Sequence, residues 1–459
     1  MALPVAPATG RAFSWESAMS RRGLLIVQVS LLLPFAMCVA QEREIKVRGD
    51  KTRIEGAGYW IYNDLPRGID EAKKSGKPLL VVFRCVPCEA CAQLDEQVAE
   101  RDPGVRELLD KFVCVRIVHA NGMDLSQFQF DYDQSWAAFL LNADLTIYGR
   151  YGTRSHQTES KADVSLEGFS KALSGALELH AQFPKNKAAL AAKRGPDSDV
   201  KVPEQFPSFK GKYGPKLDYE GKVVQSCIHC HQVGEALRLV ARSSDQPIAD
   251  KVLYPYPNPK ILGLILDPKE KAKVHQVAAD SSADRDGFRA GDEITMLVGQ
   301  PMLSIADVQW VLHHAGETGQ LNAKVVRDGQ SKSLTLTLAK GWRQRDDISW
   351  RATSWDLRRI TLGGMRLETL PEDQRRELNL PAEQLALFAK WVGQYNEHAV
   401  AKRAGFLKDD IIVAIDGDRS PITESGLITK FMQTKRPGDK ITMTVLRGQQ
   451  RLEFSFVQQ

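Results

Sequence analysis

A segment that occurs twice in this 459-residue chain constrains its fold most strongly. Residues 287–294 read GFRAGDEI and residues 405–412 read GFLKDDII, with a strand-type run after each copy. A turn at Asp328-Gly329 and the alternating leucines that follow it predict a hairpin with one buried face, and a similar hairpin ends the second copy. An internal repeat of this kind predicts two β-rich units of the same fold.

The two units resemble bacterial PDZ domains, which are small α+β folds rich in strands. The resemblance covers residues 260–338 in the first unit and residues 361–457 in the second. It implies PDZ-like domains at residues 260–340 and 361–459. Residues 341–360 are the connector, whose tryptophans and arginines are expected to pack between domains.

The resemblance also implies a peptide-binding site in each unit. In this family the backbone amides of a glycine loop hold the C-terminal carboxylate of a peptide, which adds as a strand to an open sheet edge. The matching loop residues are Leu262, Gly263 and Leu264 in the first unit, and Leu362, Gly363, Gly364 and Met365 in the second. The expected partners are therefore proteins or peptide C-termini. The alternative is that the two units pack on one another and bind nothing.

PDZ domains often accompany exported proteases, but this sequence lacks the residues of a protease. A trypsin-like enzyme needs a nucleophilic serine framed by glycines, and the only Gly-Gly pair, Gly363-Gly364, has no adjacent serine. The zinc-binding pattern H-E-x-x-H does not occur either. Proteolysis is therefore not expected.

Three cysteines follow the apolar run of residues 79–83, in the sequence Cys85-Val86-Pro87-Cys88-Glu89-Ala90-Cys91. The apolar run predicts a buried strand, and residues 92–100 predict a helix that begins directly after the cysteines. A cysteine at a helix N-terminus feels the positive end of the helix dipole, which lowers the pKa of its thiol and makes it a nucleophile. Cys85, Cys88 and Cys91 are therefore candidate redox residues, or three ligands for a soft metal ion such as copper(I) or zinc.

Residues 58–183 resemble exported thioredoxin-like proteins, which have an α/β fold. The resemblance rests on the strand with its cysteine turn, and on the sequence FLLNAD at residues 139–144, which GRYG follows shortly. It implies thiol–disulfide oxidoreductase activity in which Cys88 attacks and Cys91 resolves, with Cys85 as an extra thiol. A Cys85–Cys88 pair and a purely structural disulfide are the alternatives.

One position departs from the thioredoxin-like pattern. The chain has no proline between Pro103 and Pro184, so Trp136 takes the place of the proline that faces the disulfide in this family. A bulky indole is therefore expected beside the cysteines, where it would reshape substrate docking. This departure favours a rival interpretation, in which the chain is a non-enzymatic PDZ scaffold and its thioredoxin-like domain is a binding module.

A second cluster reads Cys227-Ile228-His229-Cys230-His231. This spacing is typical of haem c, because two thiols add to the vinyl groups of the haem and the adjacent histidine ligates the iron. Cys227 and Cys230 are thus the expected haem attachment residues, and His231 the expected metal ligand. A partial zinc site and a simple Cys227–Cys230 disulfide are the alternatives.

The C-x-x-C-H motif lies in a short segment, residues 219–259. Residues 184–218, which precede it, are rich in proline, lysine and glycine and hold few apolar side chains. Such a stretch cannot bury enough apolar surface to fold alone, so it is expected to serve as a linker.

The N-terminus predicts export. Arg21-Arg22 precede an apolar stretch that ends in small residues, which is the layout of a secretory signal over residues 1–40. After its cleavage no stable membrane span is expected, and the expected location is periplasmic or secreted. Cleavage also removes three arginines and one glutamate, so the formal charge falls from +5 to +3. Such a small excess argues against nucleic acid as a partner.

Together these patterns predict a multidomain fold with an α/β thioredoxin-like domain, a short C-x-x-C-H segment and two PDZ-like α+β domains. The expected function is that of an exported redox protein, with thiol–disulfide exchange, haem-c electron transfer, or both. The expected cofactor is covalent haem c, and the alternatives are no cofactor or a soft metal ion.

Overall fold

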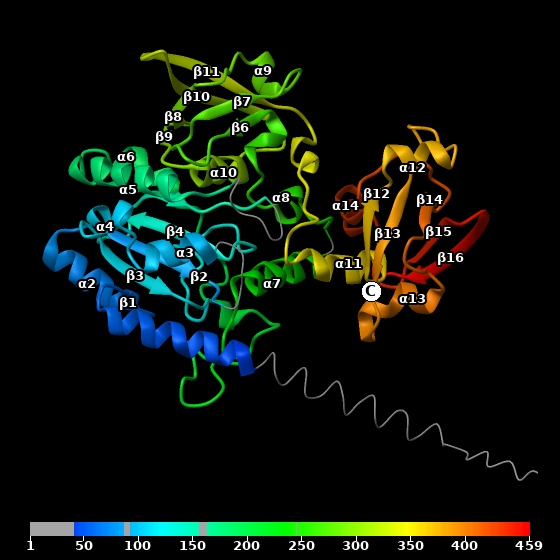
Figure 1. Cartoon of the computed structure of the whole chain (residues 1–459), viewed down its shortest axis with the longest axis horizontal. Coiled ribbons are helices and arrows are strands. Elements are labelled where there is room, and N and C mark those ends of the chain that lie inside the picture. Colours follow the sequence, from blue (N-terminus) through cyan, green and yellow to red (C-terminus); the bar gives the residue numbers. More distant parts are fainter. Residues whose placement is uncertain (1–40, 87–91, 156–162, 245) are drawn as a thin grey trace, which may run out of the picture.

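The computed structural model describes residues 41–86, 92–155, 163–244 and 246–459. Figure 1 shows three sheet-containing parts: an N-terminal part at the lower left, a second above it and a third to the right. Helix α7 (Cys230–Arg242) lies between the first and third parts. The expected signal, residues 1–40, lies outside the described residues.

The N-terminal part is built on a five-stranded sheet in the order β1-β3-β2-β4-β5. Strands β1, β3 and β2 are parallel, and β4 and β5 are antiparallel to their neighbours. The strands are β1 (Ile61–Tyr62), β2 (Leu79–Arg84), β3 (Val113–Ile117), β4 (Trp136–Leu141) and β5 (Ile147–Tyr151). Both faces of β2 are buried, which explains why its sequence is apolar throughout instead of alternating.

Helices cover both faces of this sheet. Alternate residues of β2 point to opposite faces, so Leu80 and Val82 belong to one core and Val81 and Phe83 to the other. The first core includes side chains of α3 and α5, and the second those of α7. The helices of this part are residues 41–57, α2 (Leu65–Ser75), α3 (Ala92–Ala99), α4 (Pro103–Leu109) and α5 (Leu166–Ala181).

Residues 184–218, which we expected to be a linker, lie against the thioredoxin-like sheet. They form α6 (Lys187–Leu190) and two short 3-10 turns, η1 (Ala191–Lys193) and η2 (Pro203–Gln205). Leu190, Phe206 and Phe209 are buried in the two cores beside the sheet. The segment has few apolar residues, but a sheet that is already formed supplies the surface on which they are buried. It is therefore part of the N-terminal unit.

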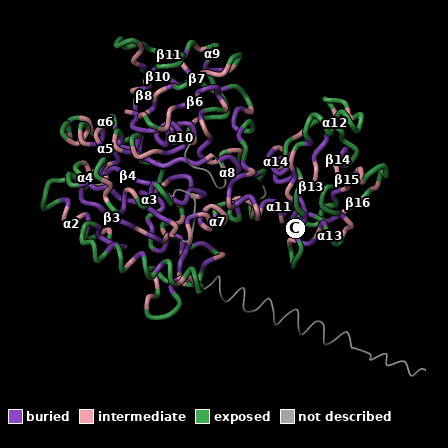
Figure 2. The backbone as a smooth tube through the Cα atoms, in the orientation of Figure 1, coloured by how far each residue is buried: buried purple, intermediate pink, exposed green. Residues whose placement is uncertain are grey.

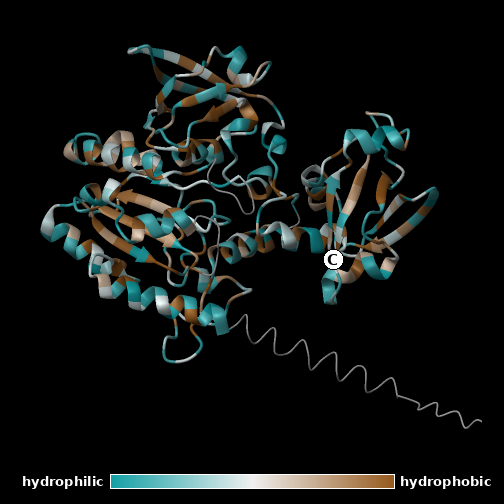
Figure 3. Cartoon of the chain, viewed as in Figure 1, coloured by the Kyte–Doolittle hydropathy of each residue, from teal (hydrophilic) through white to brown (hydrophobic). Residues whose placement is uncertain are grey.

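The two repeated units form the second and third parts. In the first, β10 and β11 pair along their whole length around the Asp328-Gly329 turn, which confirms the predicted hairpin. Its elements are η3 (Pro259–Leu262), β6 (Leu264–Leu266), β7 (Val274–Val277), α9 (Ser282–Arg285), β8 (Glu293–Leu297), β9 (Gln300–Pro301), α10 (Ile305–His314), β10 (Gly319–Arg327) and β11 (Gln330–Leu338). Figure 3 shows the apolar residues gathered on these strands.

The third part is a five-stranded sheet in the order β12-β13-β14-β15-β16, with β12 at its edge. Helix α8 (Asp250–Leu253) lies before the first repeated unit, and η4 (Trp342–Arg345) lies in the connector. The other elements are α11 (Ser354–Leu362), β12 (Met365–Thr369), α12 (Glu372–Glu377), β13 (Leu387–Val392), η5 (Asn396–Ala399), α13 (Val400–Ala404), β14 (Ile411–Ile415), α14 (Glu424–Thr434), β15 (Lys440–Arg447) and β16 (Gln450–Val457).

The first repeated unit packs on the thioredoxin-like part through α10. Every residue from Ile305 to Leu312 is buried, which Figure 2 shows as a continuous purple helix at the junction. Lys193 Nζ lies 2.8 Å from Asp307 Oδ1 with both side chains fully buried. The Arg150 guanidinium lies 3.6 Å from the centre of the Trp310 ring. Such a buried, charge-matched junction holds the two parts as one body.

The connector joins the third part to the first two. Arg351 is buried and donates from Nη1 to both carboxylate oxygens of Asp131, at 2.6 and 2.8 Å, and from Nη2 to the carbonyl of Pro255. Thr353 donates to Asp133 through both its backbone N and its hydroxyl. The expectation that residues 341–360 pack between domains is therefore met. Among the described residues, no helix is both long and apolar enough to cross a bilayer.

We expect Arg351→Met to lower the free energy of unfolding by about 3–5 kcal/mol, because it leaves the Asp131 and Asp133 carboxylates buried without their main cation. The measurement is urea unfolding followed by tryptophan fluorescence. Arg67→Met removes an exposed helix pair with Glu71 and serves as the control, with a change below about 0.5 kcal/mol. Equal changes in the free energy of unfolding for the two variants would show that the buried pairs of Arg351 add no more stability than an exposed pair.

Candidate functional site

The structure brings the two cysteine clusters together. Cys85 lies at the end of β2, and Cys227 and Cys230 lie at the start of α7. The Cys85 Sγ is 3.5 Å from Nδ1 of His229, which is 144 residues away in the sequence. A charge on Cys85 also raises the pKa of both other thiols, so the three thiols interact electrostatically. What the sequence presents as two sites is one centre.

Asn121 fastens the second cluster to the thioredoxin-like domain. Its side-chain Oδ1 accepts from the backbone N of Ile228 at 2.8 Å, and its Nδ2 donates to the carbonyls of Ser226 and Gly214. The backbone N of Ala120 donates to the carbonyl of Ile228 at 2.8 Å. Asn121 is buried, so these bonds are shielded from water. The loop after β3 therefore sets the position of Cys227 and Cys230.

The thiols of this cluster are held in their protonated form. Burial, and secondarily the charge of Cys85, raises the pKa of Cys227 to about 12. Burial likewise raises the pKa of Cys230, with smaller contributions from Cys85 and Cys227. A thiol with such a pKa holds almost no thiolate at neutral pH. The Cys227/Cys230 pair therefore needs a nearby base before it can attack a disulfide.

His229, between these two cysteines, lies beside the third thiol, Cys85. Burial, and secondarily the charges of His231 and Arg43, lower the pKa of its imidazole to about 4. The ring is therefore neutral at pH 7, and Nδ1 can accept a hydrogen bond from the Cys85 thiol. Sequence reasoning missed this contact, although the place of His229 inside the C-x-x-C spacing was a signal for a role with the thiols.

Cys88 and Cys91, the expected attacking and resolving thiols, lie outside the described residues. Their neighbour Cys85 donates its backbone N–H to the carbonyl of Ser135 at 2.9 Å, so Ser135 and Trp136 do lie beside the cysteine turn. The Trp136 indole is 1 % exposed, packs against Tyr151 and Phe169, and donates from Nε1 to Asp95. The indole therefore belongs to the core beside the sheet, and its expected effect on substrate docking stays a prediction.

A buried charge network lies directly under the cysteine turn. Asp95, in the first turn of α3, pairs with Arg84 at 3.0 Å and with Arg116 at 2.6 Å. Arg116 in turn binds Asp50, whose carboxylate also accepts from the Tyr62 hydroxyl. Burial raises the pKa of Asp95, but its hydrogen bonds and attraction to Arg116 outweigh burial and keep the pKa below its usual value. The network is charge-balanced and fixes the start of α3 behind the cysteines.

The packed surroundings of Cys227 and Cys230 do not fit a covalent haem. Each thiol residue is 9 % exposed, Ile228 between them is fully buried, and Cys227 Sγ lies 4.0 Å from the carbonyl oxygen of Val118. A macrocycle bonded to both sulfurs needs an open slot beside them, whereas protein fills this space. Burial lowers the pKa of His231, so its imidazole is neutral as a ligand requires, but it stacks on His229. Haem attachment stays a prediction.

Metal binding by the cysteines also stays a prediction. Within the part of the chain that the structure describes, no group of three or more Cys, His, Asp or Glu side chains has the geometry to hold a metal ion. Cys85 is described, whereas its expected fellow ligands Cys88 and Cys91 are not. Cys114, in contrast, is a core residue, with a buried thiol whose pKa burial raises to about 12.

The expected carboxylate-binding loops of the PDZ units use their amides within the chain. The backbone N–H groups of Gly363 and Gly364 both donate to the carbonyl of Arg358, at the end of α11. The N–H of Gly263 donates to the carbonyl of Lys260 in the turn before it. The remaining loop residues, Leu262, Leu264, Leu362 and Met365, are buried. A peptide carboxylate would have to displace these internal bonds.

Helix α11 also occupies the space beside β12, where a peptide strand would add. It packs against both β12 and α14, the two elements that would flank the peptide. Arg358 on α11 forms a buried ion pair with Glu424 at the start of α14, with Nη2 and Oε2 2.6 Å apart. The Glu424 carboxylate accepts from the backbone N of Leu367 at 2.7 Å. The open edge of the sheet is thus covered by the chain's own side chains.

Comparisons with known proteins identify the domains. The family model of thioredoxin-like domains matches residues 60–143, and that of PDZ domains matches residues 256–338 and 392–456. The chain therefore contains a thioredoxin-like domain followed by two PDZ domains. The second PDZ match begins after the loop at residues 362–365, which is the part of that domain covered by α11.

Individual relatives resemble separate parts of the chain. A "Probable periplasmic serine endoprotease DegP-like" from Marinomonas sp. (strain MWYL1) is 24% identical over 182 residues, which are 40% of this chain and 36% of that protein. "Anterior gradient protein 3" from Xenopus tropicalis is 23% identical over 158 residues, 32% of this chain and 93% of that protein. The HtrA3 PDZ domain, solved with the phage-derived ligand FGRWV, is 23% identical over 21% of this chain and 82% of its own, with a TM-score of 0.16. The chain spans about a third of the length of the DegP-like relative.

We expect iodoacetamide to alkylate Cys227 in the folded protein at pH 8 about 1,000-fold more slowly than in urea. The reason is that a pKa of about 12 instead of 9.0 lowers the thiolate fraction by that factor. A raised pKa leaves less thiolate at every pH below it, so the folded-state rate should rise about tenfold per pH unit between pH 7 and 10. Peptide mass spectrometry gives the rate for each cysteine.

The same measurement tests whether Asn121 fixes the position of Cys227. Asn121→Ala removes the two hydrogen bonds to Ser226 and Ile228, and a third to Gly214, and should raise the alkylation rate of Cys227 about tenfold or more. Asn322→Ala, on the exposed face of β10, is the matched control and should leave the rate unchanged. Equal rates in folded and unfolded protein would contradict the buried placement of Cys227.

Proposed function

We propose that this chain is an exported thiol–disulfide exchange protein whose cysteines act as one centre. The observation that supports this proposal is the distance of 3.5 Å between Cys85 Sγ and His229 Nδ1, a contact that joins the loop after β2 to the segment of Cys227 and Cys230. A neutral imidazole beside a partly exposed thiol accepts its hydrogen bond and so orients the sulfur for attack. The thioredoxin-like domain supplies the fold on which such chemistry is commonly built.

The exchange proceeds in two steps at the loop. Cys88 attacks one sulfur of a partner disulfide, a mixed disulfide forms, and the partner's other sulfur leaves as a thiolate. Cys91 then attacks the Cys88 sulfur and releases the second partner thiolate. The partner disulfide gains two electrons and two protons, and the Cys88 and Cys91 thiols become a disulfide.

The Cys227/Cys230 pair returns the loop to its reduced state. Cys85, as a thiolate, attacks the loop disulfide and displaces one loop thiolate. A thiol of the buried pair then loses its proton to solvent, attacks the Cys85 sulfur and displaces the second loop thiolate. The other buried thiol attacks the disulfide so formed and releases Cys85, so two electrons pass to the loop and Cys227 joins Cys230 in a disulfide, which an external dithiol reduces. Because burial keeps the pair protonated, it resists direct oxidation.

An exported location suits this chemistry. Disulfides form and are exchanged outside the cytoplasm, and residues 1–40 have the layout of a secretory signal. The DegP-like relatives carry the word "periplasmic" in their names, which agrees with a periplasmic or secreted location. Haem-c electron transfer through Cys227, Cys230 and His231 is the rival function. The C-x-x-C-H motif supports haem binding, whereas the packed surroundings of Cys227 and Cys230 described above argue against it.

In an insulin-reduction assay with dithiothreitol, we expect Cys88→Ser to remove the activity of the chain, because the attacking sulfur is lost. Cys85→Ser should lower the rate about tenfold, because the loop then loses its link to the buried pair. Cys114→Ser is the matched control, since this thiol lies in the core and should change the rate by less than about twofold. Equal rates for all four proteins would contradict thiol exchange.

A reduced pyridine haemochrome spectrum of protein made with c-type maturation machinery decides the rival function. The proposal expects no haem band and two free or oxidised thiols at Cys227 and Cys230. A covalent haem c band would contradict the proposal and would favour electron transfer as the function.

The PDZ domains are proposed to dock protein C-termini, and the second one only when α11 moves. The supporting observation is that Glu424 and α11 occupy its peptide edge. Arg358→Met removes the buried pair that holds α11, so we expect a peptide ending in FGRWV to bind about tenfold more tightly than to the parent chain.

Fluorescence anisotropy of the labelled peptide is the measurement, and the same peptide with an amidated C-terminus is the control that must not gain affinity. Arg359→Met, on the more exposed face of α11, controls for the loss of an arginine from this helix. If Arg358→Met and Arg359→Met bind the peptide alike, α11 does not close the groove.

A further inference from the structure

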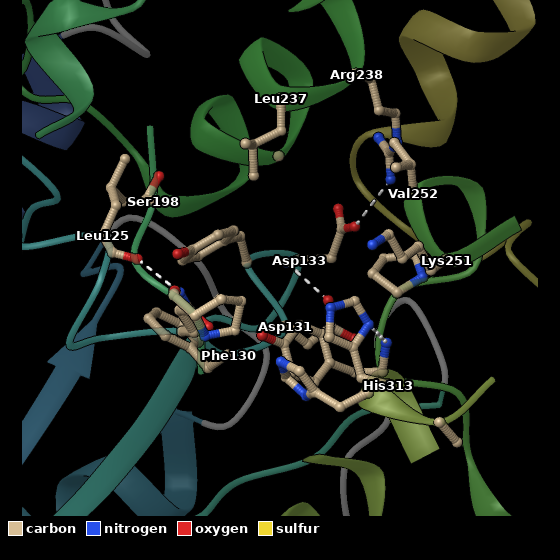
Figure 4. A pocket seen from close by; sticks show the side chains of 18 residues that line it. Leu125, Phe130, Asp131, Asp133, Ser198, Leu237, Arg238, Lys251, Val252 and His313 are labelled. Atoms are coloured by element: carbon tan, nitrogen blue, oxygen red, sulfur yellow. Dashed lines mark hydrogen bonds and ion pairs between the residues drawn. The ribbon is translucent and has the colours of Figure 1, made fainter. Parts of the chain in front are cut away.

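A cavity of about 390 Å³ lies where the thioredoxin-like domain, α7 and the first PDZ domain meet. Figure 4 shows its walls, with Phe130 and Asp131 from the thioredoxin-like domain, Leu237 and Arg238 from α7, and His313 from α10. This volume is in the range of cavities that bind small organic molecules. Of the cysteines that the structure describes, Cys85, Cys114, Cys227 and Cys230, none lines this cavity, so it is separate from the contact of Cys85 with His229.

The cavity and the thiol centre lie on different faces of the same helix. Cys230, Val233 and Ala236 of α7 pack into the core against the sheet. Gly234, Leu237 and Arg238 instead line the cavity. A residue that fills the cavity can therefore be changed without touching the cysteines.

Arg238 is a buried cation with hydrogen-bond donors that have no acceptor in the described part of the chain. Its side chain is 7 % exposed, and its nearest carboxylate partner, Asp133 Oδ2, is 3.7 Å from Nη2. Among the described residues, neither Nε nor Nη1 of Arg238 has a hydrogen-bond partner. Buried N–H groups without acceptors are costly, so this guanidinium is suited to a ligand that brings an acceptor.

The carboxylates near Arg238 are already paired. Asp131 and Asp133 are the carboxylates of the cavity wall, and both bind Arg351. Arg238 and Lys251 are the cations of the wall. Because Arg351 takes up the two carboxylates, the Arg238 guanidinium stays open to an acceptor from a ligand.

Most of the rest of the wall is apolar or aromatic, with Gln129 and Ser198 as its uncharged polar side chains. Leu125, Leu237 and Val252 supply apolar surface, and Phe130 and Tyr132 supply rings. Tyr256 and His313 add two further rings, which stack at 4.1 Å with an angle of 14°. Burial keeps the pKa of His313 well below its usual value, so the His313 ring is neutral at pH 7. Such a wall accepts a flat, uncharged ligand body.

We infer that this cavity binds a small aromatic carboxylate, with the carboxylate on Arg238 and the ring body between Phe130, Leu237 and Val252. The carboxylate satisfies the free donors of the guanidinium. The ring replaces the apolar contacts that the cavity now lacks. This is a binding site in addition to the thiol centre, and it does not depend on the proposed thiol exchange.

The test compares two probes of the same shape on the full chain, naphthalene-2-carboxylate and the neutral naphthalen-2-ylmethanol. Isothermal titration should show the carboxylate binding about tenfold more tightly than the alcohol, because only the carboxylate pairs with Arg238. Arg238→Gln should bring the two affinities to within about twofold of each other. Equal affinities in the parent chain, or no binding of the carboxylate at millimolar concentration, would overturn the inference.

A pair of tryptophan variants places the site. Leu237→Trp fills the cavity and should weaken carboxylate binding about tenfold or more. Leu239→Trp, two residues further along α7 and similarly exposed, lies outside the cavity and should leave binding unchanged. Thermal unfolding confirms that both variants fold. Equal binding by the two variants would show that the probe binds elsewhere and would overturn the inference.

Discussion

The hydrogen bonds of Asn121 are the constraint on which the rest of the structure depends. They fix Ile228 against the loop after β3, and α7 begins two residues later. One face of α7 then completes a core of the thioredoxin-like sheet and brings Cys227 and Cys230 to Cys85. Its other face closes the cavity that Arg238 lines. One buried amide side chain therefore positions both candidate sites.

Buried charge pairs fix the positions of the domains, as Asn121 fixes the positions of the cysteines. Lys193 and Asp307 hold the first PDZ domain, and Arg351 with Asp131 holds the connector. These pairs cost desolvation energy, so they specify one arrangement of the parts more than they add stability. Arg358 and Glu424 act in the same way within the second PDZ domain, where they keep α11 over the sheet edge. The PDZ domains thus serve first as packing units of this chain.

Local patterns in the sequence predicted the elements well, and long-range contacts limited the prediction of the site. The apolar run at residues 79–83 is the buried strand β2, and the helix expected at residues 92–100 is α3. The meeting of the cysteine clusters depends on contacts between residues more than 100 positions apart, for which no local pattern exists. The polar composition of residues 184–218 predicts a linker. Phe206 and Phe209, three residues apart, instead form one apolar face, which is buried against the sheet. The filled PDZ groove was missed because a family pattern shows the groove but not what covers it.

The most direct test of the central claim is disulfide mapping of a chain with the changes Cys88→Ser, Cys91→Ser and Cys230→Ser. Cys85 and Cys227 are then the two thiols left in the centre, and mild oxidation with diamide followed by peptide mass spectrometry shows their partners. If the two clusters form one centre, the result is an intramolecular Cys85–Cys227 disulfide. Cys85 and Cys227 that remain separate thiols, or that join only between chains, would contradict it.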